Sequence, residues 1–578
     1  MDNQRLLVWA AFGLMLWITY QAWMQDYGQR PAQPSEAPAP ITAPVESGPE
    51  LPALVEPLND GSGDASRDGS RREAGDGPGL DAATGPAQTR AGTIRVQTDV
   101  LEIEISEQGG TLQRAMLRKY PVHKDRPNDL VELLSPEASN YGLLETGLRT
   151  AGGGAEPNHL AIFSAPANHF ELGSNEELVV PLAWSDGQGV TVEKALRFTR
   201  GSYRIDVTQK LINDSEAEWR GADYAQIRRR SFPIERSMFD VDSYSFDGPV
   251  IFNGEKSEKP DRDDLLSDGP MTQTANNGWV ASIQHHFLSA VQPASDQPYR
   301  YSIAIKDNVA VSSLIAAPVA VAAGGEHVFE TTLFVGPKLQ RQLEQISPQL
   351  KLTVDYGWLT ILSQPLFWLL SKVYSLVTNW GLAIILVTIL IKIAFYKLTE
   401  ASGRSMAKMR EIQPRMKALQ DRYKDDRQQL SQAMMELYKR EKVNPAAGCL
   451  PILIQMPFFL AFYWVLLESV EMRQAPFALW ITDLSSRDPY FILPLIMGAA
   501  MFFQQKLNPA PADPVQAKVM QIMPVVFTGF FAFFPSGLVL YWVTNTLLSI
   551  AQQWRVNKVV HQEALAAKGV KKKKNGDD

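Results

Sequence analysis

The chain has 578 residues, a formal net charge of -7 and a single cysteine, Cys449. The charge argues against a nucleic-acid-binding protein by bulk charge, and one cysteine excludes an intrachain disulfide. The length suits more than one domain, and the sequence divides into a polar first part and a very apolar last part.

The first segment, residues 1–25, contains the apolar run Leu6–Met24 after Arg5. This run is longer than the apolar core of a typical signal peptide, and no A-x-A cleavage pattern follows it directly. We therefore expect an N-terminal transmembrane anchor, and a cleaved signal peptide is the alternative. Residues 26–92 are rich in Pro, Gly, Ala, Ser and acidic residues, which predicts a disordered tether because few of them could build a core.

Residues 93–340 alternate apolar and polar side chains, as in Leu101–Ile105. Gly, Asn and Asp turn signals separate these runs, which is typical of antiparallel strands with one packed face, so we expect a large β-sandwich domain. Adjacent His285 and His286 are expected to point to opposite faces of a strand. The histidines of this segment show no metal-ligand spacing, and we expect no catalytic or metal role for His123, His159, His169, His285, His286 and His327.

An amphipathic segment, residues 354–378, carries Trp and Tyr side chains and is interrupted by Pro365. Such a segment favours an interfacial helix on the outer membrane surface, and a separate membrane span is the alternative.

The stretch Trp380–Thr399 is long enough to cross a bilayer core of about 30 Å as one helix, yet it contains Lys392. Thr388 lies four residues earlier and therefore on the same helix face. Two interpretations of the cation stay open. Its side chain could snorkel toward the headgroups near Lys397, or it could face a wet interior.

A cytoplasmic helical hairpin is expected at residues 400–444, where basic residues outnumber acidic ones and apolar residues recur at helical spacing. Its seam is rich in methionine, which indicates either ordinary core or an adaptable binding surface. The methionines concerned are Met406, Met409, Met416, Met434 and Met435.

Four further apolar segments predict membrane spans, at about residues 449–470, 489–506, 519–534 and 537–554. Counting cations places the hairpin and the basic tail, 556–578, on the cytoplasmic side, with both termini cytoplasmic and the β-domain periplasmic. We thus expect a polytopic α-helical protein of the bacterial inner membrane with six transmembrane helices.

Polar residues within these spans are costly where they face lipid, so they are expected to face a bundle interior or a wet cavity. Besides Thr388 and Lys392 they are Gln455, Gln504, Gln505 and Asn545. Ordinary interhelical hydrogen bonds would explain one or two of them. No Asp or Glu lies in mid-span to neutralise Lys392, which implies water or a visiting acidic partner.

The block from Met406 to Pro494, with VNPAAGCLPILIQMP at its centre, and the later FPSGLVLYWVTNTLLSIAQQ resemble the YidC/Oxa1/Alb3 membrane protein insertase family in its Gram-negative YidC form. The resemblance implies a five-helix insertase core, residues 379–555, with a hydrophilic groove. The family's groove cation, usually Arg, falls on Lys392, its substrate-contacting Thr on Thr388, and its contact aromatic on Trp542, beside Tyr541.

Two departures from the family pattern stand out. Lys at 392 keeps the charge of Arg but loses its planar fork of donors. The usual Tyr-Pro-Leu-Thr reads Tyr396-Lys397-Leu398-Thr399 here, which adds a cation.

The function implied is a membrane protein insertase and folding chaperone that works alone or with the Sec translocon, without cofactor, metal or catalytic residues. Implied partners are newly made membrane proteins, the Sec translocon, the ribosome and the phospholipid membrane, with the tail Lys571–Lys574 as a site for anionic surfaces. A small-solute transporter would need a charge relay or broken-helix sites, and a hydrolase would need a nucleophile constellation. Neither pattern is evident in the sequence.

Overall fold

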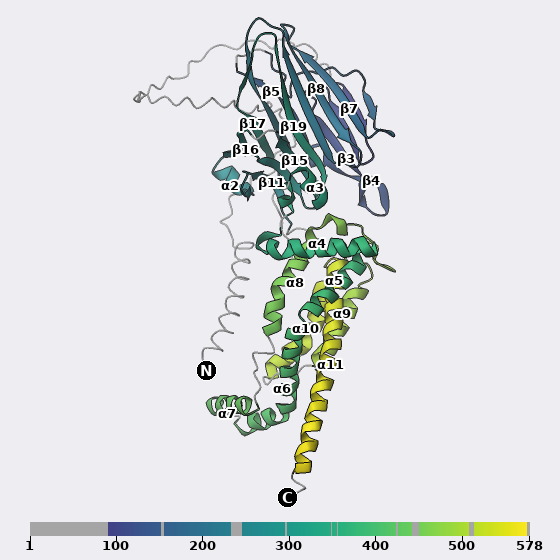
Figure 1. The fold of residues 1–578 in the computed structure, drawn as a ribbon, viewed down its shortest axis with the longest axis vertical. Helices are drawn as coiled ribbons and strands as arrows, with labels where there is room; N and C mark the ends of the chain where they lie inside the picture. The colour runs from purple at the N-terminus through teal and green to yellow at the C-terminus, as the bar shows by residue number, and fades with distance from the viewer. Residues whose placement is uncertain are drawn as a thin grey trace, which may run out of the picture. The chain divides into compact units, whose positions relative to one another are not determined.

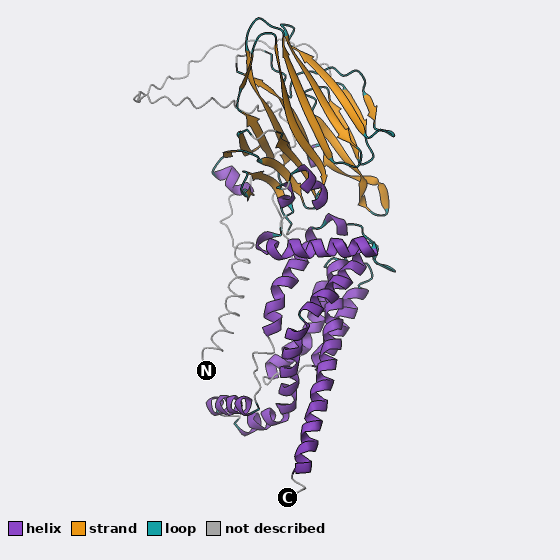
Figure 2. Cartoon of the chain, viewed as in Figure 1, coloured by secondary structure: helices purple, strands orange, loops and turns teal. Residues whose placement is uncertain are grey.

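The structure is a computed structural model that describes residues 91–574, except 152–154, 233–244, 295–296, 348, 355, 424–425, 442–449 and 508–513. The expected anchor at 1–25, nearly all of the expected tether at 26–92 and Cys449 lie outside the described residues. Figure 1 gives the order of the elements along the chain, and Figure 2 separates the strands from the helices.

The first part of the described chain forms two β-sheets that pack face to face. The larger sheet has the order β13 (Met271–Ala275), β16 (Tyr299–Lys306), β17 (Val309–Ala316), β10 (Trp219–Arg230), β5 (Gly142–Thr150), β3 (Leu112–His123), β2 (Leu101–Ser106), β1 (Thr93–Gln97) and β6 (His169–Glu171), with β4 (Arg126–Leu134) on β3 and β18 (Val319–Val321) on β10. The smaller sheet has the order β12 (Ser257–Glu258), β11 (Asp247–Phe252), β14 (Trp279–Gln284), β15 (Phe287–Pro293), β19 (Gly325–Pro337), β9 (Arg204–Asn213), β8 (Val190–Thr199) and β7 (Glu177–Ser185).

The period-two pattern of the sequence places one face of each sheet in the core. In β2, Leu101, Ile103 and Ile105 are buried and the residues between them are partly exposed. The large aromatic residues Trp279, Tyr224 and Tyr301 are fully buried. The predicted β-sandwich is therefore confirmed.

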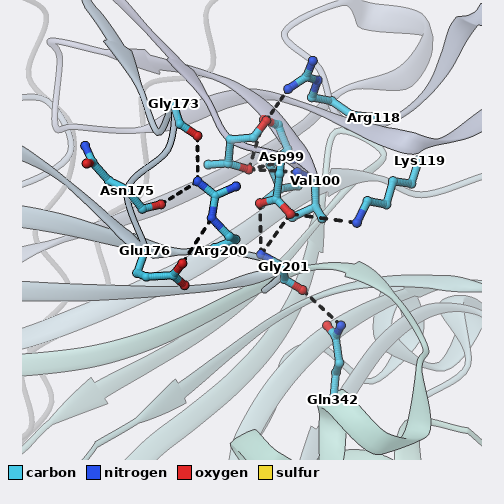
Figure 3. Close-up of polar contacts among 12 residues, drawn as sticks. Asp99, Val100, Arg118, Lys119, Gly173, Asn175, Glu176, Arg200, Gly201 and Gln342 are labelled. Atoms are coloured by element: carbon cyan, nitrogen blue, oxygen red, sulfur yellow. Dashed lines mark hydrogen bonds and ion pairs between the residues drawn. The ribbon is translucent and has the colours of Figure 1, made fainter.

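Turns at one end of the sandwich join the two sheets through polar contacts (Figure 3). The Asp99 carboxylate, between β1 and β2, accepts hydrogen bonds from the backbone N–H of Gly201, between β8 and β9, at 3.0 and 3.1 Å. The Gly201 carbonyl in turn accepts from Gln342 Nε2 at 3.2 Å, which fixes the short helix α3 (Gln340–Ile346) on this end. These contacts hold together turns that lie far apart in the sequence.

The expectation that His285 and His286 point to opposite faces of a strand is wrong. The two residues form the turn between β14 and β15, since Gln284 pairs with Phe287. Their rings stack with centroids 3.7 Å apart, and His285 has a positive φ of 42°. Side chains alternate only within a strand, so a two-residue turn removes the geometry on which the expectation depended.

The remaining described elements are helical. They are α2 (Arg262–Ser267) within the β-domain, and then α4 (Thr360–Val377), α5 (Trp380–Ala394), α6 (Tyr396–Arg422), α7 (Arg427–Arg440), α8 (Leu450–Glu468), α9 (Ile492–Leu507), α10 (Pro514–Phe531) and α11 (Ser536–Lys574). In Figure 1, α4 lies across the ends of α5 and α8, and it packs on both. One face of α4 is buried, while Trp368 and Leu376 on its other side are exposed, as an interfacial helix would require.

The stretch Trp380–Thr399 was predicted as one helix, and the structure corrects this. Helix α5 ends at Ala394 and α6 starts at Tyr396, with a bend of 68° between them. The sequence contains no Gly or Pro at the break. Phe395, between the helices, packs edge-on against Phe458 of α8 at a centroid distance of 5.0 Å. A tertiary contact therefore accompanies a bend for which local sequence gave no signal.

Within the described residues, length and hydropathy together single out only the bent pair of α5 and α6 as a candidate span, and no helix qualifies by itself. Shorter apolar helices occupy Ile454–Glu468, Ile492–Leu507 and Lys518–Phe531.

A buried ion pair joins the end of the β-domain to α8. Lys338 Nζ lies 3.0 Å from Glu468 Oε2, and the two side chains are 2% and 6% exposed. The other carboxylate oxygen accepts a hydrogen bond from Ser245 Oγ at 2.7 Å. Both oxygens of the buried carboxylate are thus satisfied, as burial of a charge demands.

Candidate functional site

The Lys392 side chain reaches from α5 to α11. Its Nζ donates a hydrogen bond to Ser549 Oγ at 2.8 Å, and the side chain is half-buried. Ser549 Oγ itself donates to the carbonyl of Asn545 at 2.7 Å, one turn earlier on α11. Among the described residues Lys392 has no ion pair, so a cation lies between two apolar helices with only a neutral partner.

Thr388 lies one turn before Lys392 and is buried. Its hydroxyl donates to the carbonyl of Ile384 at 2.6 Å, within α5. This back-bonding satisfies the hydroxyl proton without a partner on another helix, while its lone pairs stay available as acceptors.

The start of α6 brings further polar groups to the same region. Gln455 Nε2 of α8 donates to Thr399 Oγ1 at 3.3 Å, and Gln552 Nε2 of α11 donates to the carbonyl of Tyr396 at 3.3 Å. The first turn of α6, directly after the bend at Phe395, thus accepts hydrogen bonds from side chains of two other helices. Hydrogen bonds thus connect α5, α6, α8 and α11 around the bend.

Two of the predicted groove aromatics form an apolar cluster. Tyr541 is buried, and its ring stacks on Phe459 at 5.7 Å and meets Phe462 edge-on at 4.9 Å. Trp542 contacts Phe459 at 4.5 Å and Phe531 at 4.7 Å. These contacts join α8, α10 and α11, and none of them involves Lys392.

Gln505 takes part in a different contact, in which its Nε2 donates to the carbonyl of Met520 between α9 and α10. Lys392, Asn545 and Gln455 therefore lie on the helices that surround the bend between α5 and α6. Gln505 instead bonds between α9 and α10.

Sequence reasoning missed Ser549, Gln552 and Thr399. The sequence did contain a signal for Ser549 and Gln552. Together with Asn545 they occupy positions i, i+4 and i+7 of one helix, which places all three on one helix face. Thr399 carried no such signal, because its role depends on the bend.

The hairpin helices α6 and α7 share a small apolar core built on Ile412, Met416 and Leu437. Of the predicted methionines, Met409 and Met434 pack against this core, while Met406 and Met435 are half-buried outside it. The hairpin seam is therefore partly methionine and partly branched aliphatic.

The carboxyl-terminal part of α11 also packs on α6. Val556 and Val560 form a buried cluster with Ala407, and Arg404 Nη1 lies 3.0 Å from a Glu563 carboxylate oxygen. Gly403 has no side chain at the point where Val556 approaches, so the two helices come close together.

The described chain thus combines a β-sandwich domain with a set of apolar helices that hold Lys392 between α5 and α11. Family models match both parts: the YidC periplasmic domain over residues 93–369 and the 60Kd inner membrane protein over residues 372–563. Two relatives are named membrane protein insertase YidC. The protein from Nitrosococcus oceani is 45% identical, over 97% of this chain and 100% of its own length. The protein from Methylococcus capsulatus is 43% identical, over 98% of this chain and 100% of its own length. The chain belongs to the YidC family of membrane protein insertases.

Among solved structures, an active YidC insertase is 19% identical, with a TM-score of 0.36, over 80% of this chain and 94% of that one. A galactose mutarotase-like protein from Lactobacillus casei is 12% identical, with a TM-score of 0.30, over 42% of this chain and 100% of that one. Both TM-scores are low, so the family assignment rests on the sequence relatives. The family is one of insertases of the inner membrane and not of enzymes, and the β-sandwich corresponds to its periplasmic domain.

Proposed function

We propose that the polar region around the bend between α5 and α6 is the groove through which this insertase receives its clients. One observation carries the proposal: Lys392, half-buried among apolar helices, has Ser549 at 2.8 Å as its partner and no carboxylate partner among the described residues. A cation in this position attracts an anionic group that enters the region. The groove residues are Lys392, Thr388, Gln455, Asn545, Ser549 and Thr399, and Tyr541 and Trp542 line its apolar wall.

In this mechanism the incoming chain places a short polar or acidic segment beside Lys392. An acidic side chain at the centre of a bilayer costs about 2.5–3.5 kcal/mol on insertion scales. Contact with a cation and with hydroxyl and amide donors offsets part of that cost. The apolar helix of the client then leaves sideways into lipid, because lipid surrounds all of its apolar surface whereas the groove also presents polar groups to it.

The proposal extends to the parts of the chain on either side of the groove. The hairpin of α6 and α7 makes first contact with the client through its methionine-containing seam, and the basic end of α11 favours the ribosome. Six membrane spans, cytoplasmic termini and cooperation with the Sec translocon complete the proposal, and they are supported by the cation distribution and by the family resemblance.

The test is complementation of a cell depleted of its own insertase, with Lys392, Lys392→Arg or Lys392→Met. The readout is protease accessibility of a small Sec-independent client with an acidic translocated segment. If the cation offsets even about 1.4 kcal/mol of the cost, its loss slows insertion about tenfold. Lys392→Arg should support insertion, since it retains the charge.

Lys372→Met is the matched control, because Lys372 is an exposed lysine on α4 away from the bend. A second client whose translocated segment is neutral separates charge pairing from general damage: Lys392→Met should impair it less. Equal insertion of the acidic client by the Lys, Arg and Met forms would refute a role for this cation and leave a snorkelling lysine.

A further inference from the structure

A cavity of about 790 Å³ lies where four connections between elements meet, away from the bend between α5 and α6. Its walls come from the β3–β4 hairpin, the β14–β15 turn, the chain between α8 and α9, and the turn between α10 and α11. These are the ends of the helices that adjoin the periplasmic domain, so the family places this cavity on the periplasmic side.

The walls carry more available positive than negative charge. The cationic side chains are Lys124, Arg473 and Arg487, and the acidic ones are Asp125 and Asp483. The Asp483 carboxylate is already occupied: it accepts from the N–H of Gln474 and Ser485 and from the hydroxyls of Ser485 and Ser486, at 2.7 to 2.9 Å. These hydrogen bonds leave the Asp483 charge in place, so three cations face two carboxylates and the lining keeps a net charge of +1.

Arg473 is held firmly and still has a donor without a partner. Its Nη2 donates to the carbonyls of Pro121 and Val122 at 2.9 and 3.2 Å, and its guanidinium lies over the Phe287 ring at 5.4 Å. Its Nη1 is buried and has no hydrogen-bond partner in the described structure. A buried donor of this kind carries a free-energy penalty until an acceptor reaches it.

His286 is the second such group in the cavity wall. The side chain is 8% exposed, and its Nδ1 has no hydrogen-bond partner among the described residues. Burial and the nearby cations hold the pKa of His286 well below its usual value, so the ring is neutral. His286 and Arg473 thus each bring one buried polar atom without a described hydrogen-bond partner to the lining of this cavity.

The rim of the cavity on the helix side is apolar. Phe533 of the lining is 41% exposed, and Tyr490, next to the lining residue Pro489, is 66% exposed. Beyond this rim, α9 and α10 present exposed apolar side chains, including Leu495 and Val525. A polar, cationic cavity that opens beside an apolar helix surface fits a ligand with an anionic head and apolar chains.

We propose that this cavity binds the phosphodiester headgroup of a phospholipid from the periplasmic leaflet, with the acyl chains along α9 and α10. Arg473 and Arg487 bind the phosphate oxygens, for which guanidinium groups are well shaped. Lys124 already donates to the carbonyls of Gln474 and Thr482, and it adds positive charge from the β3–β4 hairpin. The lipid thus links the periplasmic domain, the chain between α8 and α9 and the bilayer. The groove around Lys392 plays no part in this inference.

The experiment uses purified, delipidated full-length protein in detergent. Dihexanoyl-phosphatidylglycerol is titrated, and native mass spectrometry counts the lipid molecules retained per protein. Arg487→Gln removes an exposed cation of the cavity, and Arg473→Lys keeps the charge but loses the fork of donors. Arg220→Gln is the matched control, because Arg220 is an exposed arginine of β10 outside the cavity lining. Thermal unfolding of each variant verifies that it is folded.

We expect the wild type and Arg220→Gln to retain one tightly bound lipid, and Arg487→Gln to bind it about tenfold more weakly through loss of a charge-assisted contact. Arg473→Lys should show an intermediate loss. Equal retention by the cavity variants and Arg220→Gln overturns the proposal. Displacement of the lipid by an equal concentration of inorganic phosphate also overturns the proposal, because it indicates a site for free anions. Displacement by an equal concentration of an acidic peptide overturns it as well, because it indicates a site that contacts clients.

Discussion

The ion pair between Lys338 and Glu468 allows a quantitative test of how the periplasmic domain is joined to α8. Replacing Lys338 by Met leaves the Glu468 carboxylate buried, with Ser245 as its remaining hydrogen-bond partner. Removing one member of a buried pair typically costs about 3–5 kcal/mol, because the other charge is left uncompensated. We expect the same order of loss from Lys338→Met and from Glu468→Leu.

The double variant Lys338→Met/Glu468→Leu should recover most of that loss, because neither of the two charges is then buried without its partner. Replacement of a buried ion pair by apolar residues is often neutral or stabilising. The measurement is thermal unfolding of the full-length protein in detergent, followed by tryptophan fluorescence. At about 2–4 °C per kcal/mol for a domain of this size, each single variant should lose about 10 °C.

The matched control is the pair Lys210–Glu326, which is closer, at 2.6 Å, but has side chains 36% and 62% exposed. Lys210→Met should leave the unfolding temperature almost unchanged, since water and salt screen an exposed pair. If the double variant is as unstable as the sum of the singles, or if Lys210→Met costs as much as Lys338→Met, burial is not what makes the Lys338–Glu468 contact important.

Two further predictions concern the interior of each part of the chain. Burial lowers the pKa of Lys194 to about 7 from an ordinary 10.5. Between these pH values Lys194 is protonated in the unfolded chain and neutral in the folded one, so the unfolded chain binds more protons. The free energy of unfolding should therefore rise with pH in this range. Lys194→Met should flatten this rise in unfolding temperature between pH 7 and 10, and an unchanged slope would show that Lys194 does not titrate there. In α5, a Cβ at Gly381 would overlap the ring of Phe477, so Gly381→Ala should lower the unfolding temperature. Gly529→Ala in α10, where nothing lies within 4 Å, should leave it unchanged or raise it, because alanine favours helix by about 0.5–1 kcal/mol; the same result for both variants would contradict this.

Sequence reasoning succeeded where a pattern depends on local geometry alone. The alternation in Leu101–Ile105 predicts a strand with one buried face, and β2 has that burial pattern. It failed where a distant contact decides the conformation. Phe395 ends α5 beside Phe458 of α8, and no residue near Phe395 in the sequence announces the bend.

The candidate site shows the same contrast between residues with a local sequence signal and residues placed by distant contacts. Lys392 is conspicuous in an apolar stretch, so it was found from the sequence alone. Its partner Ser549 is an ordinary residue of a distant helix, and only the packing of α11 on α5 brings the two together. Glu468 is the last residue of α8, and its partner Lys338 lies 130 positions away and could not be inferred from the sequence.

Helix α11 continues without interruption from Ser536 to Lys574, a rod of about 58 Å at 1.5 Å per residue. Ser549, which bonds Lys392, and Val556, which packs on α6, are fixed points along this one rod. The two contacts lie about 10 Å apart along the helix axis, so a single helix holds both α5 and α6 on the two sides of their 68° bend.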